Sequence, residues 1–271
     1  IKSIHIGTSF QNISTSIKIL FILIFIGFGL NIENPQILIL SPVEGDIDVI
    51  FSAPFAVSLV WVSYAYTGWN SVIYIAGEVK NPLQNITKSM LFSTSIVMVL
   101  YLLLNYTFLL TTPLMTLRGE IEVAFLSGIE IFGLNGGKII SIAISLLLLS
   151  TISSYIYIGP RILAIMGEDH KELNYFNKKD LKGIPINAFF LQFFLSILFI
   201  LTSSFEQVLM YTGVCLIIIS CITVSSLFLS RFKEKNLYRP YKAFGYPLTP
   251  LVYLTLNIWI LFYSFIHSTI E

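Results

Sequence analysis

The sequence predicts an all-α fold, a polytopic membrane helix bundle. Of its 271 residues, 55% are hydrophobic and only 11% are charged, and the mean hydropathy is +0.82. A soluble domain carries about 25% charged residues, and a core of this size could not enclose so much apolar surface, so we expect the excess to face lipid. The apolar segments are about 20 residues long and do not alternate in polarity, which favours spanning helices over barrel strands.

Seven apolar segments are long enough to cross roughly 30 Å of hydrocarbon as helices. We expect these spans at about residues 12–30, 52–77, 89–112, 138–160, 185–204, 208–230 and 248–268. Turn-forming residues lie between them, at Asn34-Pro35, Ser41-Pro42, Asn81-Pro82, Asn135-Gly136-Gly137 and Arg239-Pro240. No linker divides the chain, so we expect residues 1–271 to form a single transmembrane domain.

Basic residues gather on one side of the predicted membrane. If the residues before the first span lie inside, the outside loops hold Arg118 and Lys138, Lys18 lies within a span, and the inside loops hold the remainder of the 16 lysines and arginines. Positively charged loops favour the cytoplasmic side. We therefore expect an integral membrane protein of the plasma membrane, with the start of this chain in the cytoplasm and its end outside.

The middle of the second span differs from every other span. Residues 66–71 read Tyr-Thr-Gly-Trp-Asn-Ser, near mid-bilayer depth. Gly68 lowers helix propensity by about 1 kcal/mol relative to alanine, and Thr67 and Asn70 offer the backbone other hydrogen bonds. One interpretation is a broken helix whose carbonyls and amides line a polar cavity that suits a zwitterion. The other is a packing notch, because small residues let helices approach closely.

Polar residues in three other spans also have two interpretations. Asn105 in the third span and Ser150, Thr151 and Ser154 in the fourth either face the same cavity or form interhelical hydrogen bonds worth about 0.6 kcal/mol each. Lys18 in the first span either extends back to the cytoplasmic interface or faces the bundle as a fixed or protonatable cation.

Several function classes are excluded by the sequence. A net charge of +1 lacks the excess of positive charge that nucleic-acid binding proteins carry. Cys215 and Cys221 stand six residues apart with no CxxC pattern, so neither a disulfide framework nor a zinc site is expected. The sequence contains no HExxH, P-loop or serine nucleophile elbow. We therefore expect no enzyme, no metal and no cofactor.

Two blocks in and after the second span resemble the amino acid–polyamine–organocation transporters, and in particular their L-type amino-acid transporter branch. The first block reads Tyr64-Ala65-Tyr66-Thr67-Gly68-Trp69-Asn70, and the second reads Gly77-Glu78-Val79-Lys80-Asn81-Pro82. Weaker matches are Gln11-Asn12 with Lys18, Asn105, Arg161, Arg239-Pro240-Tyr241-Lys242 and Gly245-Tyr246-Pro247. The resemblance implies a twelve-helix architecture with two inverted five-helix repeats, of which this chain looks like helices five to eleven.

The resemblance also implies a function and a substrate site. The function is secondary active transport of amino acids by alternating access, as a sodium-independent exchanger or proton-coupled permease. The carbonyls of Tyr64 and Thr67 would accept hydrogen bonds from the substrate ammonium, and the Tyr64 ring would close over the substrate, where the family usually has Phe. The substrate-binding set that the resemblance implies is Tyr64, Ala65, Thr67, Gly68, Trp69 and Asn70.

A separate coupling set is implied around Lys18. Its ammonium would take the place of a sodium ion in related carriers, close to Ser150, Thr151 and Ser154, and Asn105 would have a structural polar role. The expected partners are an amino acid and the bilayer.

The first four helices and the twelfth have no counterpart in this chain, which begins with isoleucine and is interpreted as a fragment. Their contacts would come from another segment or chain. The alternative function is therefore an inactive or incomplete fragment that acts only as a membrane-embedded subunit.

Overall fold

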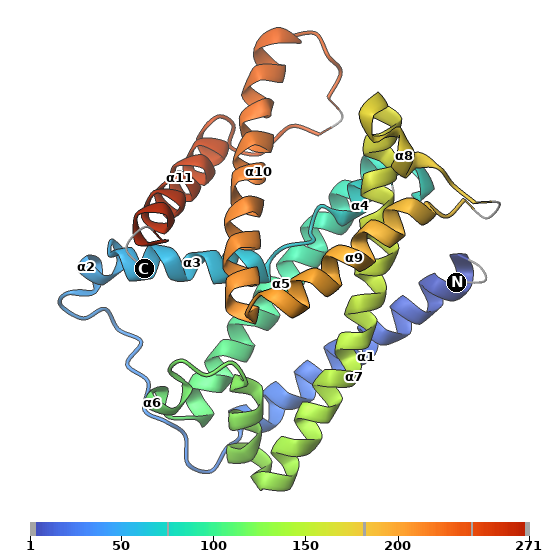
Figure 1. The fold of residues 1–271 in the computed structure, drawn as a ribbon. Coiled ribbons are helices and arrows are strands. Elements are labelled where there is room, and N and C mark those ends of the chain that lie inside the picture. The colour runs from blue at the N-terminus through green and yellow to red at the C-terminus, as the bar shows by residue number, and fades with distance from the viewer. Residues whose placement is uncertain (1–3, 75, 181–182, 240, 269–271) are drawn as a thin grey trace. The chain divides into compact units, whose positions relative to one another are not determined.

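The computed structural model describes residues 4–74, 76–180, 183–239 and 241–268 (Figure 1). Throughout these ranges the regular structure is helical, apart from an isolated bridge between Lys179 and Pro185. The predicted all-α fold is confirmed. Four positions lie outside the described residues: Pro240, Ile75 in the second span, and two of the basic residues expected inside, Lys2 and Lys182.

The helices occur in thirteen segments within the described ranges. They are α1 (Ile4–Leu30), α2 (Asp46–Ile50), α3 (Ala53–Ala65), α4 (Ser71–Tyr74), η1 (Ala76–Glu78), α5 (Pro82–Thr111), α6 (Leu114–Leu117), α7 (Val123–Asp169), η2 (Lys171–Leu173), α8 (Asn174–Asn177), α9 (Ile186–Thr202), α10 (Phe205–Lys233) and α11 (Leu248–Ser268). They divide into two compact units. Unit 1 comprises Ile1–Leu40 and Phe92–Gln192, and unit 2 comprises Ser41–Leu91 and Phe193–Glu271.

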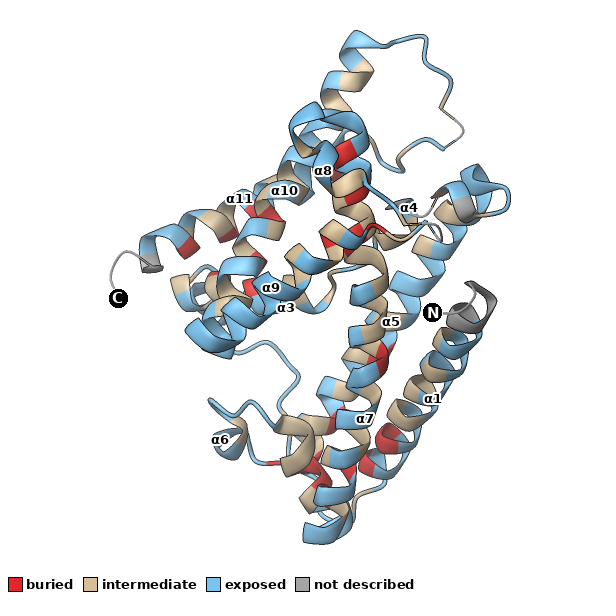
Figure 2. Ribbon diagram, turned by 45° about the vertical axis from the view of Figure 1, so that its right-hand side comes forward, coloured by how far each residue is buried: buried red, intermediate tan, exposed pale blue. Residues whose placement is uncertain are grey.

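Five of the described helices are long and apolar enough to cross a membrane. These helices contain Ser9–Leu30, Pro82–Thr111, Val123–Asp169, Phe205–Lys233 and Leu248–Ile266. The two remaining expected spans correspond to shorter apolar helices, α3 with 13 residues and α9 with 17. Much of the surface of these helices is exposed, and many exposed positions carry large hydrophobic side chains, as lipid-facing helices require (Figure 2). The chain is an integral membrane protein.

Several helix ends have a local cause in the sequence. At the start of α10, Ser204 Oγ accepts a hydrogen bond from the Gln207 amide at 3.2 Å, and Gln207 Oε1 accepts one from the Ser204 amide at 3.2 Å. This reciprocal pair satisfies two backbone donors that a helix start leaves open. The start of α3 is capped by Ser52, and α5 begins at Pro82, which lacks the amide donor that would be unpaired there.

The predicted turn at Asn135-Gly136-Gly137 is wrong. These residues lie inside α7, and the backbone departs from helical geometry earlier, at Gly133, with φ 75° and ψ 177°. The neighbouring glycines allow close packing. A Cβ on Gly137 would lie 2.6 Å from Ile129 Cγ1, and one on Gly128 would lie 2.6 Å from Ile140 Cδ1. Small residues therefore let residues 123–132 pack against the start of the long helix.

The long part of α7, from residue 134 onward, rises about 54 Å at 1.5 Å per residue, so it extends well past the hydrocarbon core. It contains the buried Pro160, which has no amide proton to donate to the carbonyl of Ile156. At its far end, η2 and α8 pack against Gly167, where a Cβ would lie 2.6 Å from the Leu173 carbonyl oxygen. Glu168 there forms a salt bridge of 2.8 Å with Lys179.

The core of unit 2 is formed by α3, α10 and α11. Val60, Ile217 and Ile260 are buried together, one from each helix. A glycine in α10 brings two of the helices close, because a Cβ on Gly213 would lie 2.8 Å from Val60 Cγ1. The C-terminal half of α3 is thus held between two long helices.

The core of unit 1 lies where α1 packs against α7 and the second half of α5. Phe25 is buried in α1, and its ring meets that of Phe108 edge-on, with centroids 5.8 Å apart. Gly29 contacts Thr107, which is fully buried. These contacts position one face of α1 against the second half of α5.

The Gly213–Val60 contact predicts an over-packing effect that a second substitution relieves. Gly213→Ala should lower the free energy of unfolding by about 1–3 kcal/mol, because the new methyl overlaps Val60. Adding Val60→Ala to that variant should restore part of the loss. The measurement is a double-mutant cycle of unfolding in mixed micelles.

A glycine with space around it is the control. Gly27 has no atom within 4 Å of an added Cβ, so Gly27→Ala should gain up to about 1 kcal/mol from helix propensity. Additive effects of Gly213→Ala and Val60→Ala would contradict the proposed contact.

Candidate functional site

The second expected span is interrupted, which agrees with the broken-helix interpretation of its sequence. Helix α3 ends at Ala65, residues 66–70 form turns, and the four-residue α4 begins at Ser71. Gly68 has φ 95°, a left-handed conformation that strains any residue with a side chain. An added Cβ there would have only Ser71 Oγ within 4 Å, at 3.8 Å. The requirement for glycine at this position is therefore conformational and does not come from lack of space.

Shorter hydrogen bonds replace the helical pattern at the break. The amides of Tyr66 and Thr67 donate to carbonyls three residues earlier, at 3.2 and 3.0 Å. The Thr67 hydroxyl also donates to the Tyr64 carbonyl, at 2.7 Å. The backbone carbonyl oxygen of Tyr64 therefore accepts two hydrogen bonds, one for each of its two lone pairs. In this conformation Thr67 donates to one of the two carbonyls that the resemblance assigns to the substrate ammonium, that of Tyr64.

The remaining residues of the predicted substrate set lie around this turn. Tyr64 and Ala65 form the last turn of α3; the Tyr64 side chain is half-buried, whereas Ala65 is exposed. Trp69 is 48% exposed, and the Asn70 carbonyl accepts a hydrogen bond from the Ile73 amide at 3.0 Å. The structure thus places the whole set in one segment of unit 2. Whether these residues bind substrate stays a prediction.

Lys18 and Thr151 are in direct contact within unit 1. Lys18 Nζ, from α1, donates a hydrogen bond of 2.8 Å to Thr151 Oγ1 on α7. The neighbouring Ser150 is buried, and Ser154 Oγ donates to the Ser150 carbonyl at 3.2 Å. The structure therefore brings Lys18 to Thr151, while Ser150 and Ser154 are neighbours of Thr151 on α7 with no direct contact to Lys18 shown. Their role in coupling stays a prediction.

Sequence reasoning did not assign Gln11 to this set. Gln11 Nε2 donates to the Ser150 carbonyl at 3.4 Å, and Ser150 Oγ donates to Gln11 Oε1 at 3.5 Å, so both hydrogen bonds are long. The missed signal was periodicity, since Gln11 and Lys18 are seven residues apart and lie on one helix face. Together they align α1 with Ser150 and Thr151.

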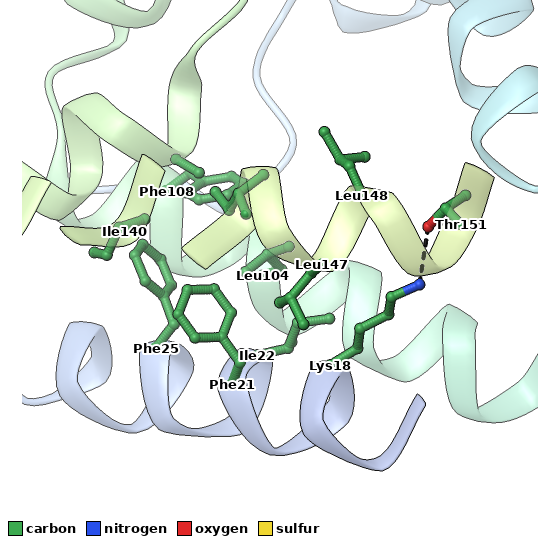
Figure 3. Close-up of a pocket in the computed structure, with 12 residues that line it drawn as sticks. Lys18, Phe21, Ile22, Phe25, Leu104, Phe108, Ile140, Leu147, Leu148 and Thr151 are labelled. Carbon is green, nitrogen blue, oxygen red and sulfur yellow. Dashed lines mark hydrogen bonds between the residues drawn. The ribbon is translucent and has the colours of Figure 1, made fainter. Parts of the chain in front are cut away.

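A cavity of about 230 Å³ lies beside Lys18, within unit 1 (Figure 3). Lys18 and Thr151 are its polar members, and aromatic and aliphatic side chains of α1, α5 and α7 supply the remainder of its lining. Figure 3 shows Lys18 extending toward Thr151 at one end, with Phe21 and Phe25 further along α1. The ammonium thus borders an apolar space, where a fixed positive charge has a stronger electrostatic effect than in water.

Asn105 and Thr107 have different environments. Asn105 lies on an exposed position of α5, and its Nδ2 donates to the Tyr101 carbonyl at 2.8 Å within the same helix. Thr107 is fully buried, and its hydroxyl donates to the Leu103 carbonyl at 2.8 Å. Of these two residues, Thr107 is the one packed inside unit 1.

Comparison with known proteins gives a consistent family. The chain is 24% identical to the b(0,+)-type amino acid transporter 1 of Rattus norvegicus, over 98% of this chain and 54% of the relative. It is 26% identical to solute carrier family 7 member 12 of Mus musculus, over 96% of this chain and 55% of the relative. It is 25% identical to the serine/threonine exchanger SteT of Bacillus subtilis (strain 168), over 98% of this chain and 61% of the relative.

These relatives are named as transporters, solute carriers or exchangers, none as an enzyme. The chain spans about half the length of the first curated relatives it matches. The family described as amino acid permease matches residues 1–269, nearly the whole chain. With its membrane-spanning helices and its interrupted second span, the chain belongs to the amino acid permease family.

Proposed function

We propose that this chain forms part of a sodium-independent secondary transporter that moves amino acids across the plasma membrane by alternating access. The observation that carries this proposal is the break at residues 66–70 in an apolar span. Polar backbone at membrane depth is tolerated only where protein or a water-filled cavity satisfies it. Such breaks form the solute sites of many secondary transporters.

The carbonyl side of the break is the stronger candidate for substrate contact. Helix α3 has 13 residues, so its C-terminal end carries the partial negative charge of a helix dipole and favours a cation. Helix α4 has only four residues and offers little dipole to a carboxylate. The proposed contact is therefore the α-ammonium of an amino acid at the end of α3.

Substrate binding at the Tyr64 carbonyl requires a local exchange of hydrogen bonds. Because that oxygen already accepts from the amide and hydroxyl of Thr67, an ammonium group would displace at least the hydroxyl. The carbonyl is thus satisfied both without substrate and with it. This exchange would keep the cost of an empty site low in the membrane.

Lys18 is the proposed coupling residue. Its ammonium supplies a fixed charge between α1 and α7, held by the Thr151 hydroxyl. A covalently attached cation removes the need for a bound metal ion. It allows exchange while charged, or proton coupling if it releases its proton during the cycle.

The proposed orientation follows the distribution of lysine and arginine. The loops expected inside carry most of these residues, so the start of this chain lies in the cytoplasm and its end outside.

A second candidate function is that of a membrane-embedded subunit without transport of its own. The reason to consider it is that this chain spans only about half of the length of its relatives. Proteoliposomes holding only this chain that bind no amino acid would favour this candidate.

Substitution of Gly68 tests the proposed substrate site. Gly68→Val should weaken amino-acid binding roughly 5- to 150-fold, because a branched residue at φ 95° costs about 1–3 kcal/mol. The measurement is equilibrium binding of radiolabelled neutral and cationic amino acids to the reconstituted protein.

Gly77→Val is the matched control. Gly77 also has space for a side chain but no left-handed φ, so its variant should bind as the unmodified protein does. Unchanged affinity in Gly68→Val would show that substrate binding does not depend on this turn.

Substitution of Lys18 tests the proposed coupling. Lys18→Ala should abolish amino-acid uptake, or remove its dependence on pH, while the yield of folded protein stays nearly unchanged. Thr151→Val should cause a smaller loss, because it removes only the acceptor that holds the ammonium. Uptake is measured across a pH series in proteoliposomes that hold the complete transporter of which this chain is proposed to form part.

The exposed Lys138 provides the control for loss of a positive charge. Lys138→Ala should leave uptake and its pH profile intact. If Lys18→Ala behaves in the same way, Lys18 serves only to anchor its helix at the interface.

A further inference from the structure

The loop between α10 and α11 is held at the membrane surface from both sides. Helix α10 ends at Lys233 and α11 begins at Leu248, and both are candidate spans. The connection of about fourteen residues therefore cannot move far from the bilayer interface. Of its positions, residues 234–239 and 241–247 are described.

Arg239 fixes the first half of this loop to the end of α10. Its guanidinium donates to the carbonyls of Glu234 at 2.9 Å, Leu237 at 3.0 Å and Ser230 at 3.2 Å. The last carbonyls of a helix lack partners within the helix, and an arginine is well suited to satisfy them. Arg239 is thus committed to an internal structural role.

Arg231 fixes the second half. Its guanidinium carbon lies 3.7 Å from the centroid of the Tyr246 ring, within range of a cation–π interaction. The same ring lies 5.5 Å from that of Phe228, one helical turn earlier. Both ends of the loop are therefore attached to α10, and the loop has a defined shape.

The residues left at the surface are basic and aromatic. Lys233, Lys235 and Lys242 are all exposed, and Glu234 is the acidic residue among them. Large apolar side chains are exposed in the same segment: Phe232, Leu237, Tyr238, Tyr241 and Phe244, with Phe244 86% exposed and Tyr238 82% exposed. Aromatic rings prefer the headgroup level of a bilayer, and lysines beside a span attract anionic headgroups.

We propose that this loop is a binding surface for anionic phospholipids of the leaflet it faces. The three lysines contact headgroup phosphates, and the exposed rings insert between acyl chains beside them. The two arginines position the loop and do not contact lipid. The proposal is independent of the transport function, because it uses no residue of the break or of the Lys18 set.

The test compares lipid selection by the full chain and by a triple variant. The chain in nonionic detergent is offered equal amounts of phosphatidylglycerol and phosphatidylcholine, and native mass spectrometry measures the ratio of the two bound lipids. The unmodified chain should prefer phosphatidylglycerol. Each lysine near a headgroup adds about a fivefold preference, so Lys233→Gln, Lys235→Gln and Lys242→Gln together should lower the ratio more than tenfold.

A matched variant removes the same charge elsewhere. Lys80, Lys88 and Lys171 are also exposed and are expected on the same side, Lys80 in a loop, Lys88 near the start of α5 and Lys171 in η2, so replacing all three by glutamine should change the ratio less than twofold. An equal loss in both variants would overturn the proposal, since it would indicate a general charge effect. An unchanged ratio in the loop variant would overturn it as well. Circular dichroism establishes that both variants keep their helices.

Competition with a soluble headgroup compound distinguishes binding of a lipid from binding of free phosphate. Glycerol 3-phosphate at millimolar concentration should not displace bound phosphatidylglycerol, because it lacks the chains that the exposed rings contact. Displacement that depends on the three lysines would assign the loop to a soluble phosphate compound and overturn the lipid assignment.

Discussion

This structure depends on one constraint, which is that a peptide group without a hydrogen-bond partner is very costly in lipid. Hydrocarbon offers no hydrogen bonds, so each carbonyl and amide must find a partner within the protein. Most of the chain meets this demand with continuous helices. At residues 66–70 it does so differently, with three-residue turns and a threonine hydroxyl that satisfies the Tyr64 carbonyl. The site and its proposed chemistry follow from this exception.

The helical fold and the position of the break were predictable because they depend on local physics. Apolar length determines where spans occur, and a glycine among Thr, Trp and Asn weakens a helix wherever it lies. The contact of Lys18 with Thr151 had a different origin: it came from the family resemblance, since periodicity alone does not tell which helix faces α1. Gln11 shares the face of Lys18 and could have been found by its spacing.

Other features required knowledge of partner surfaces. Asn135-Gly136-Gly137 has the composition of a turn, yet glycine serves equally well where two helices touch. Only the position of Ile129 against Gly137 distinguishes these uses. The hydrogen bond from the Thr67 hydroxyl to the Tyr64 carbonyl could likewise not be predicted from the sequence, because it depends on the rotamer of Thr67. The contacts of Arg231, in the last turn of α10, and of Arg239, in the loop that follows, require the folded path of that loop.

Pro160 gives α7 a mechanical property. It stands between Thr151, which holds the Lys18 ammonium, and Glu168, which is paired with Lys179 at the far end of the helix. Because the Ile156 carbonyl already lacks its helical donor, a bend at this level breaks no bond that the helix possesses. A bend of α7 at Pro160 therefore costs less than a bend elsewhere in the long helix, because one backbone hydrogen bond is already missing there.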